Sequence, residues 1–226
     1  MGEYVIGIPL GDLIPASFVR RVNRFVIEVE LSGRRTFSYI RDTGRMKDYL
    51  IPGNRVYLIE KESGKYRYLL RAVEGRPGLV LADPYLDNQM VRLWLEEKGF
   101  RVDTKGLKFG RSLFDLRFER GGRECVCEVK GSNMYYKGWA VFPDVYSSRA
   151  ERHFRTLADM DGCRWLVFVS HFPTKRIGIN PEFPNLSEIV EKGMQNGLEV
   201  HALSTRITGN TWWLEGEVSF SPVVRR

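Results

Sequence analysis

The sequence contains few cysteines and few histidines. Its 226 residues include three of each. Cys125 and Cys127 lie two apart in one predicted strand, and residues so placed are poor disulfide partners because a bridge needs converging Cβ vectors. Few metal sites use such a pair without further ligands nearby, and Cys163 and His153 are distant in the sequence. We therefore predict three reduced thiols packed in the core, as in a cytoplasmic protein.

Long apolar runs are also missing. No run approaches the roughly 18–20 residues that a membrane span needs. The first residues carry no basic cluster, and Pro9 interrupts the only apolar stretch there, so we expect neither a signal peptide nor a membrane partner. Repeats, low-complexity tracts and long linkers are absent from the sequence. The hydrophobic fraction of 43% is enough for a real core, and the length fits one large domain or two small ones.

The positive charge is concentrated in the first third of the chain. Residues 1–80 hold 14 Lys/Arg and 9 Asp/Glu, a net charge of +5 out of +7 for the whole chain. Several of these basic residues stand in pairs or beside aromatics, which suits contact with phosphates and bases. The alternative is a solvated basic surface. The candidates for DNA binding in this part are Arg20, Arg21, Arg24, Arg45 and Lys47.

The first 80 residues show five short strand-like runs separated by turn signals. This spacing is typical of a small β-barrel, and a five-stranded OB-type barrel matches its size. We therefore predict an OB-type nucleic-acid-binding domain over residues 1–82. The runs cover residues 18–31, 34–41, 54–60, 66–73 and 79–82.

The pattern changes after Asp83-Pro84. Helical periodicity is found over residues 87–98, 148–161 and 186–196, and each of these stretches is followed by glycine. Strand-like runs lie between and after them, including the fully apolar 165–169. The order predicts an α/β domain with a mixed sheet over residues 83–226.

The most informative feature is a predicted hairpin over residues 113–130. Gly121-Gly122 suits a tight turn in which both central residues need positive φ. With these two residues in the turn, Asp115 faces Glu128 on one side of the sheet. Lys130 lies two residues beyond Glu128 and points the same way. The hairpin thus brings two carboxylates and an ammonium group together.

Two interpretations of this cluster remain open. Two facing carboxylates repel each other, and a divalent cation reverses that effect, since Mg²⁺ binds carboxylate oxygens and needs only one or two of them. Alternatively the three residues form a solvent-facing strand with a weak ion pair. The apolar neighbours of the cluster favour the first interpretation. We therefore assign Asp115 and Glu128 as metal ligands for Mg²⁺ or Mn²⁺, and Asp115, Glu128 and Lys130 as catalytic candidates.

Several stretches resemble the sugar fermentation stimulation protein A family of bacteria and archaea. The resemblance runs from about residue 15 to 205, and its most specific part combines Glu-Val-Lys, Phe-Pro-Asp and the helix that follows. The matching residues are Arg20-Arg21-Val22-Asn23-Arg24-Phe25, Asp42-Thr43-Gly44-Arg45-Met46, Pro52-Gly53, Asn88, Ser112 to Asp115, Glu128-Val129-Lys130, Phe142-Pro143-Asp144, Arg149, His153, Leu157 and Asn180-Pro181.

The resemblance implies an OB-type domain joined to a nuclease-like domain of the PD-(D/E)XK class. It implies DNA binding without sequence specificity and a link to the regulation of sugar metabolism genes. Asp115, Glu128 and Lys130 match the two acids and the lysine of the class motif. The sequence departs from the family pattern at two positions, since Asp42 stands where the family usually has Asn, and Leu113 where it usually has Arg.

The second region contributes further candidates and two rival functions. Arg149 and His153 share one face of a predicted helix and suit contact with phosphate, although a lone helical histidine is often structural. Asn88 is either a helix cap or a neighbour of the metal cluster. The protein is then a DNA-binding protein or a metal-dependent DNA endonuclease. RNA and single strands remain alternative ligands, because OB folds bind single strands of either kind. The oligomeric state stays open.

Overall fold

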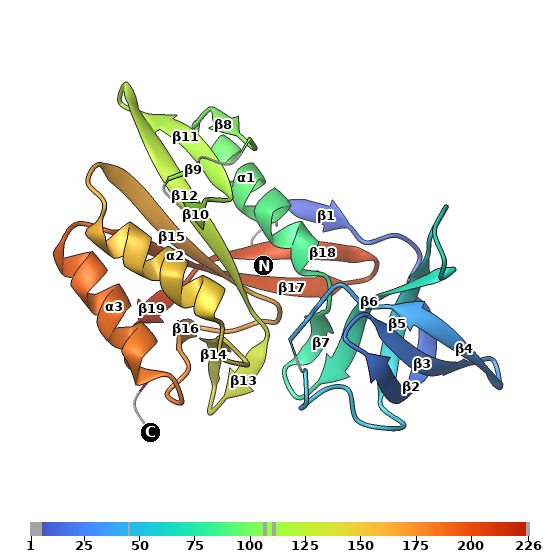
Figure 1. Ribbon diagram of the computed structural model, residues 1–226. Helices are drawn as coiled ribbons and strands as arrows, with labels where there is room; N and C mark the ends of the chain where they lie inside the picture. Colours follow the sequence, from blue (N-terminus) through green and yellow to red (C-terminus); the bar gives the residue numbers. More distant parts are fainter. Residues whose placement is uncertain (1–5, 45, 106–107, 110–111, 225–226) are drawn as a thin grey trace.

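The computed structural model describes residues 6–44, 46–105, 108–109 and 112–224. Figure 1 shows two regions, a small barrel formed by the early strands and a larger layered region of sheet and helices. None of the described helices is long and apolar enough to cross a membrane.

Five strands close the barrel. They follow the order β4-β3-β2-β5-β6, and a parallel pairing of β4 with β6 closes the ring. A further strand, β7, extends the sheet beside β6. The bounds are β2 Ile14–Asn23, β3 Val26–Leu31, β4 Arg34–Tyr39, β5 Arg55–Glu60, β6 Tyr68–Gly75 and β7 Gly78–Leu81. The predicted OB-type barrel is confirmed. The run predicted over 18–31 is in fact two strands, because the chain turns at Arg24-Phe25.

The larger region contains a seven-stranded mixed sheet in the order β1-β18-β17-β15-β12-β11-β8. The central strands β12, β15 and β17 are parallel and the outer pairings are antiparallel. The bounds are β1 Gly7–Pro9, β8 Val102–Asp103, β11 Leu116–Arg120, β12 Arg123–Ser132, β15 Cys163–Ser170, β17 Glu199–Thr208 and β18 Thr211–Glu217. The predicted α/β region with a mixed sheet is confirmed.

Three α-helices cover the two faces of this sheet. The helices are α1 Asp87–Glu97, α2 Ser148–Asp159 and α3 Pro184–Gln195, with a short 3₁₀ turn η1 over Pro84–Leu86 before α1. One buried cluster joins α1 to Cys127 and Val129 of β12, and another joins α2 and α3 to Val126. Since neighbouring strand residues point to opposite faces, Glu128 and Lys130 lie on the α2 side with Val126.

The remaining strands form two small sheets. One has the order β13-β14-β16-β19 and the other pairs β9 with β10. Their bounds are β9 Lys108–Phe109, β10 Ser112–Leu113, β13 Met134–Tyr136, β14 Trp139–Phe142, β16 Arg176–Ile179 and β19 Ser219–Ser221.

The first described strand belongs to the larger sheet. Ile8 of β1 pairs with Trp212 of β18, so β1 lies in the larger region, after which the chain forms the barrel and then returns. One buried apolar cluster also contains both barrel residues such as Ile27 and residues of the larger region such as Leu166. The two regions therefore share a packed core, while the division at residue 82 remains a prediction.

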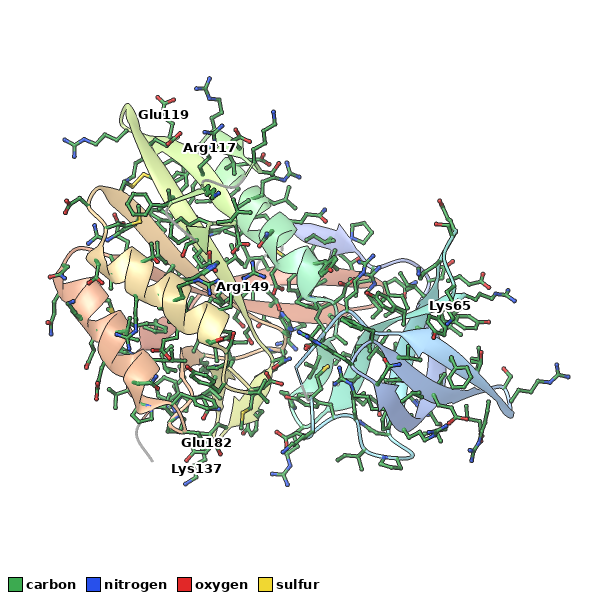
Figure 2. The ribbon with its side chains drawn as sticks, in the orientation of Figure 1. Lys65, Arg117, Glu119, Lys137, Arg149 and Glu182 are labelled. Carbon is green, nitrogen blue, oxygen red and sulfur yellow. A yellow bond between two sulfur atoms is a disulfide. The ribbon has the colours of Figure 1, made fainter. Side chains whose placement is uncertain are left out.

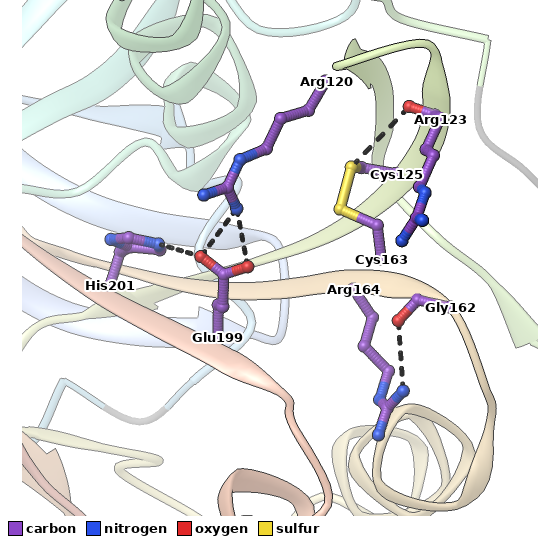
Figure 3. Close-up of a disulfide and its surroundings, with 8 residues drawn as sticks. All are labelled: Arg120, Arg123, Cys125, Gly162, Cys163, Arg164, Glu199 and His201. Carbon is purple, nitrogen blue, oxygen red and sulfur yellow. Dashed lines mark hydrogen bonds and ion pairs between the residues drawn. A yellow bond between two sulfur atoms is a disulfide. The ribbon is translucent and has the colours of Figure 1, made fainter.

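The prediction of three reduced thiols is wrong. Cys125 and Cys163 form a disulfide, and only Cys127 is free and buried. Figure 3 shows the bridge between neighbouring strands. The two residues lie directly opposite each other in the parallel pairing of β12 with β15, with Cα atoms 4.5 Å apart, which is within the range for a bridge. The sequence analysis considered disulfide partners only within one strand, because the sequence alone does not give the register of β12 against the parallel strand β15.

Candidate metal and nucleic-acid site

The β11–β12 hairpin has the predicted register. Phe118 pairs with Cys125 and Arg120 pairs with Arg123 across the Gly121-Gly122 turn. Strand β11 begins at Leu116, so Asp115 lies directly before the ladder rather than within it. Its Oδ2 accepts a hydrogen bond from the backbone N–H of Val129 at 2.9 Å. The Asp115 carboxylate is therefore fixed beside the strand segment that carries Glu128 and Lys130.

Glu128 is the most buried acid of the cluster, with 1% of its surface exposed. Its Oε1 interacts with Nζ of Lys130 and with Nδ1 of His153, the latter at 2.6 Å. Burial would raise the pKa of Glu128, but the attraction of Lys130 and the hydrogen bond from His153 outweigh it and lower that pKa. Oε2 of Glu128 is buried and has no hydrogen-bond partner within the described residues.

Asp115 has a different environment. Its side chain is half-buried, and Oδ1 accepts a hydrogen bond from Nδ2 of Asn88 at 3.4 Å. Burial raises the pKa of Asp115, and the negative charge of Glu128 raises it further. Asn88 lies in the first turn of α1 and faces the acidic pair, so it does not cap the helix. A positive charge between the two carboxylates would relieve this repulsion.

This arrangement fits a small divalent cation. The described residues contain no group of three or more His, Cys, Asp or Glu side chains that could hold a metal. A site here would therefore rest on two carboxylates, as Mg²⁺ sites commonly do, with water completing the coordination. In such a site the unpartnered Oε2 of Glu128 would supply one hard oxygen ligand and Asp115 would supply the other. The donor chemistry is right for Mg²⁺ or Mn²⁺.

A second buried pair lies behind Lys130. Nε2 of His171 is 2.8 Å from Oδ1 of Asp87, and both side chains are buried. A Cβ atom at Gly131 would lie 2.4 Å from Oδ2 of Asp87 and 2.5 Å from Nε2 of His171. Only glycine fits at this position, and the pair packs tightly against the backbone that follows Lys130. Sequence reasoning assigned no role to His171 and offered no signal for this contact.

A cleft of about 860 Å³ is lined by Asp115 and Lys130, while the buried Glu128 is not among its lining residues. The barrel contributes Arg24 and Phe25, the connection to α1 contributes Tyr85, and β12 contributes Lys130. Arg149 lines the cleft at the start of α2, close to the centre of the molecule in Figure 2. The cleft thus joins the two regions of the protein in one surface.

The basic residues predicted to bind DNA have several different environments. Arg24 and Arg149 line the cleft. Arg20 forms an ion pair with Glu28 at 2.6 Å and does not line it. Arg21 donates to the backbone oxygens of Asp42 and Arg24, both at 2.8 Å, so it holds the loop together.

Two further predicted residues do not line this cleft, and the structure does not describe a third. Lys47 is exposed but lines two other surface pockets. Arg45 lies outside the described residues. His153 is 2% exposed and binds Glu128, so its environment is not that of the expected phosphate contact.

The structure shows the surroundings of the two residues that depart from the family pattern, Asp42 and Leu113. Asp42 is buried and accepts hydrogen bonds from the N–H of Gly44 and from Nδ2 of Asn133, both at 2.7 Å. Its carboxylate thus ties a barrel loop to the end of β12. Leu113 is exposed and lies on β10.

Two aromatic residues of the cleft, Tyr85 and Tyr146, were not singled out from the sequence. Phe25, Tyr39 and Arg41 also line it. The sequence indicated these three through Arg24-Phe25 and Tyr39-Ile40-Arg41, which set an aromatic near an arginine. Tyr85 and Tyr146 had no such signal, because they stand in connections whose path depends on the packing of the two regions.

Comparisons with known proteins agree with this architecture. A family model described as the SfsA N-terminal OB domain matches residues 19–82, and one described as the sugar fermentation stimulation protein RE domain matches residues 85–211. Among solved structures, Pyrococcus furiosus SfsA in complex with Ca²⁺ superposes with a TM-score of 0.89 at 26% identity, covering 97% of this chain and all of that one.

Sequence relatives lead to the same group. A sugar fermentation stimulation protein homolog of Pyrobaculum islandicum is 34% identical over 198 residues, covering 82% of this chain and 85% of the relative. A homolog of Desulfitobacterium hafniense is 32% identical over 205 residues, covering 84% and 88%. With its OB-type barrel and its nuclease-like α/β domain, this chain belongs to the sugar fermentation stimulation protein family.

Proposed function

We propose that the protein binds DNA in the cleft between the barrel and the nuclease-like domain. One observation carries this proposal: a single cleft is lined by Arg24 and Phe25 of the barrel and by Asp115 and Lys130 of the acidic cluster. Basic side chains at the cleft would neutralise phosphates, and exposed aromatic rings offer faces to bases. The binding would be largely independent of sequence, because phosphate contacts carry no sequence information.

A specific observation favours a second function, metal-dependent cleavage of the bound DNA. The buried Oε2 of Glu128 has no partner in the part of the chain that the structure describes, and it lies in the same cluster as Asp115 and Lys130. The Ca²⁺ in the Pyrococcus furiosus relative supports a divalent cation for this chain as well. A cation bound here would lower the pKa of a bound water and stabilise the leaving oxygen.

The chain's own residues would have distinct tasks in such a reaction. His153 would hold the Glu128 carboxylate in place through its 2.6 Å contact. The N–H of Val129 and the amide of Asn88 would orient Asp115. Lys130, whose side chain is only 16% exposed, would hold an attacking water or a phosphate oxygen at the cluster.

The cellular setting follows from the partner. DNA as the ligand is consistent with the prediction of a cytoplasmic protein linked to the regulation of sugar metabolism genes. Disulfides are rare in the cytosol outside hyperthermophiles, so the Cys125–Cys163 bridge makes the redox state of the purified protein a useful check.

The test of both functions combines binding, melting and cleavage. Plasmid, linear and single-stranded DNA are incubated with the protein in Mg²⁺, Mn²⁺ or EDTA, and binding is followed by fluorescence anisotropy. Millimolar cation should raise the melting temperature of the wild type by binding only the native state, and Asp115→Asn should abolish the increase.

Asp159→Asn is the matched control for the melting experiment. Asp159 forms an exposed pair with Lys192, and its replacement should leave the cation effect unchanged. Absence of binding to every DNA would refute the proposed function. DNA binding with neither cation-dependent melting nor nicking would refute the second candidate only.

A further inference from the structure

We propose that the ligand of the cleft is single-stranded DNA, and that an unpaired base stacks on the ring of Tyr85. This inference rests on the proposed DNA binding and specifies the form of the DNA. In a duplex the faces of the bases are covered by neighbouring pairs, so only an unpaired base offers a free face to a side chain. An aromatic platform in the cleft is therefore a sign of a single strand.

Tyr85 has the properties of such a platform. Its side chain is 68% exposed, the largest value among the large hydrophobic side chains that the structure describes. Its hydroxyl has no hydrogen-bond partner in that part of the chain, so no hydrogen bond accounts for the position of the ring. An aromatic ring this accessible keeps a face free for a ligand.

One side of the Tyr85 ring is supported by a fixed cation. The Arg41 guanidinium lies 4.9 Å from the ring centroid, within the range of a cation–π contact. Arg41 also donates to Oδ2 of the fully buried Asp83 at 3.0 Å, and Arg71 binds the same oxygen. Asp83 therefore fixes the Arg41 guanidinium, which holds the Tyr85 ring in place before a base binds. A ring that is already ordered loses less entropy when a base stacks on it.

A second aromatic ring of the same cleft has similar support. Phe25 is 43% exposed, stacks on Tyr39 with centroids 6.3 Å apart, and carries the Arg24 guanidinium 5.5 Å from its centroid. Six aromatic side chains are exposed in the described chain, and three of them, Phe25, Tyr85 and Tyr146, line this cleft. Such a concentration is the arrangement that successive unpaired bases would use.

The position of Tyr85 connects stacking with the acidic cluster. Tyr85 lies in η1, three residues before Asn88, whose side chain reaches Asp115. A base on Tyr85 would therefore belong to a nucleotide close to the phosphate beside Asp115 and Lys130. This links the proposed base platform directly to the site proposed for the cation.

The test measures affinity for strands of one sequence in two forms. The full-length protein is titrated in EDTA, at one fixed salt concentration, into a labelled single-stranded DNA and into its duplex. We expect the single strand to bind at least about tenfold more tightly. Tyr85→Ala should weaken single-strand binding by about 5- to 150-fold, the range of one lost base–aromatic stack, and leave duplex binding unchanged.

Two control variants separate stacking from a general surface effect. Tyr85→Phe keeps the ring and should bind like the wild type. Phe37→Ala removes an exposed ring of the barrel that does not line the cleft, and it should also bind like the wild type. A 2-aminopurine base in the strand should be quenched on binding to the wild type and to Phe37→Ala, but not to Tyr85→Ala.

The outcomes distinguish this inference from the function on which it rests. Equal affinity for both forms, or an unchanged affinity in Tyr85→Ala, overturns the single-strand inference and leaves DNA binding intact. Binding to no DNA at all overturns both. An RNA strand of the same sequence is also titrated. If the protein binds RNA at least about tenfold more tightly than the DNA strand, the assignment of DNA is overturned.

Discussion

The two regions contribute to the cleft in opposite ways. Behind Asp115 and Lys130, which line the cleft, the nuclease-like domain holds buried polar groups on regular elements: Glu128 is 1% and His153 is 2% exposed, on β12 and α2. The barrel contributes exposed groups at its turn, and Phe25 there is 43% exposed. Groups that act on reacting atoms must be held rigidly, whereas groups that follow a flexible strand need access and some freedom.

The two regions also differ in the contacts that their arginines make. In the barrel, Arg20 and Arg21 are engaged by Glu28 and by backbone oxygens, so the net charge of +5 overstates what is free for DNA. In the nuclease-like domain, Arg149 is exposed and lines the cleft. Charge in a sequence therefore indicates a possible ligand, and only the contacts identify which charges remain available.

The largest effect is expected for Lys130. Lys130→Ala should reduce any Mn²⁺-dependent nicking of plasmid DNA at least about a hundredfold, the scale of a lost acid–base or electrostatic group. The cation-dependent rise in melting temperature should persist, because both carboxylates remain. Lys137→Ala, at an exposed turn (Figure 2), is the control and should nick like the wild type. If Lys130→Ala nicks DNA at the rate of the wild type, the cleavage takes place at another site or comes from a contaminant.

The next effect concerns stability within one helix. His153→Ala should lower the free energy of unfolding by about 2–4 kcal/mol, since it removes a buried hydrogen bond to a charged group and leaves a cavity. Arg155→Ala, which breaks an exposed pair with Glu151 on the same helix, should cost no more than about 0.5 kcal/mol. Urea unfolding measures both values. Equal costs for the two variants would contradict the rigid buried support of Glu128.

A pH effect is expected from His171. Burial would lower the pKa of His171, but the charge and hydrogen bond of Asp87 and the charge of Asp42 outweigh it, so its pKa is raised in the folded state. The resulting stabilisation is complete below the unfolded pKa of about 6.5 and is lost as the pH rises through the folded pKa.

The check for His171 is urea unfolding of the wild type and of His171→Gln from pH 6 upwards. The difference in stability between the two should shrink with rising pH, by at most about 1.4 kcal/mol per pH unit. A difference that stays constant with pH would mean that His171 does not gain a proton on folding.

The smallest effect compares two neighbouring arginines of the barrel. Arg24→Ala should lower the slope of log K for DNA against log salt by about 0.7–0.9, the value of one phosphate contact. Arg20→Ala should change that slope much less, because Glu28 already neutralises Arg20. Anisotropy titrations at several salt concentrations give both slopes. A larger change for Arg20 than for Arg24 would place the DNA on the outer barrel wall instead of the cleft.

The sequence alone determined the local elements and part of the site. Alternation and turn residues predicted the barrel strands, and periodicity with closing glycines predicted all three helices. Gly121-Gly122 set the register that brings Asp115 to the segment of Glu128, because a two-residue turn leaves only one pairing. It missed the turn at Arg24-Phe25, since both residues fit a strand pattern and the turn contains neither glycine nor proline.

Only the tertiary structure decided which distant segments meet. The Cys125–Cys163 bridge depends on the register of parallel β12 and β15, which no hairpin turn fixes. Contacts across many residues, such as His153 with Glu128 and His171 with Asp87, depend on how helices and connections pack on the sheet. Tyr85 acquires its place in the cleft in the same way. Local patterns encode hydrogen bonding within an element, whereas these contacts follow from burying apolar faces against one another.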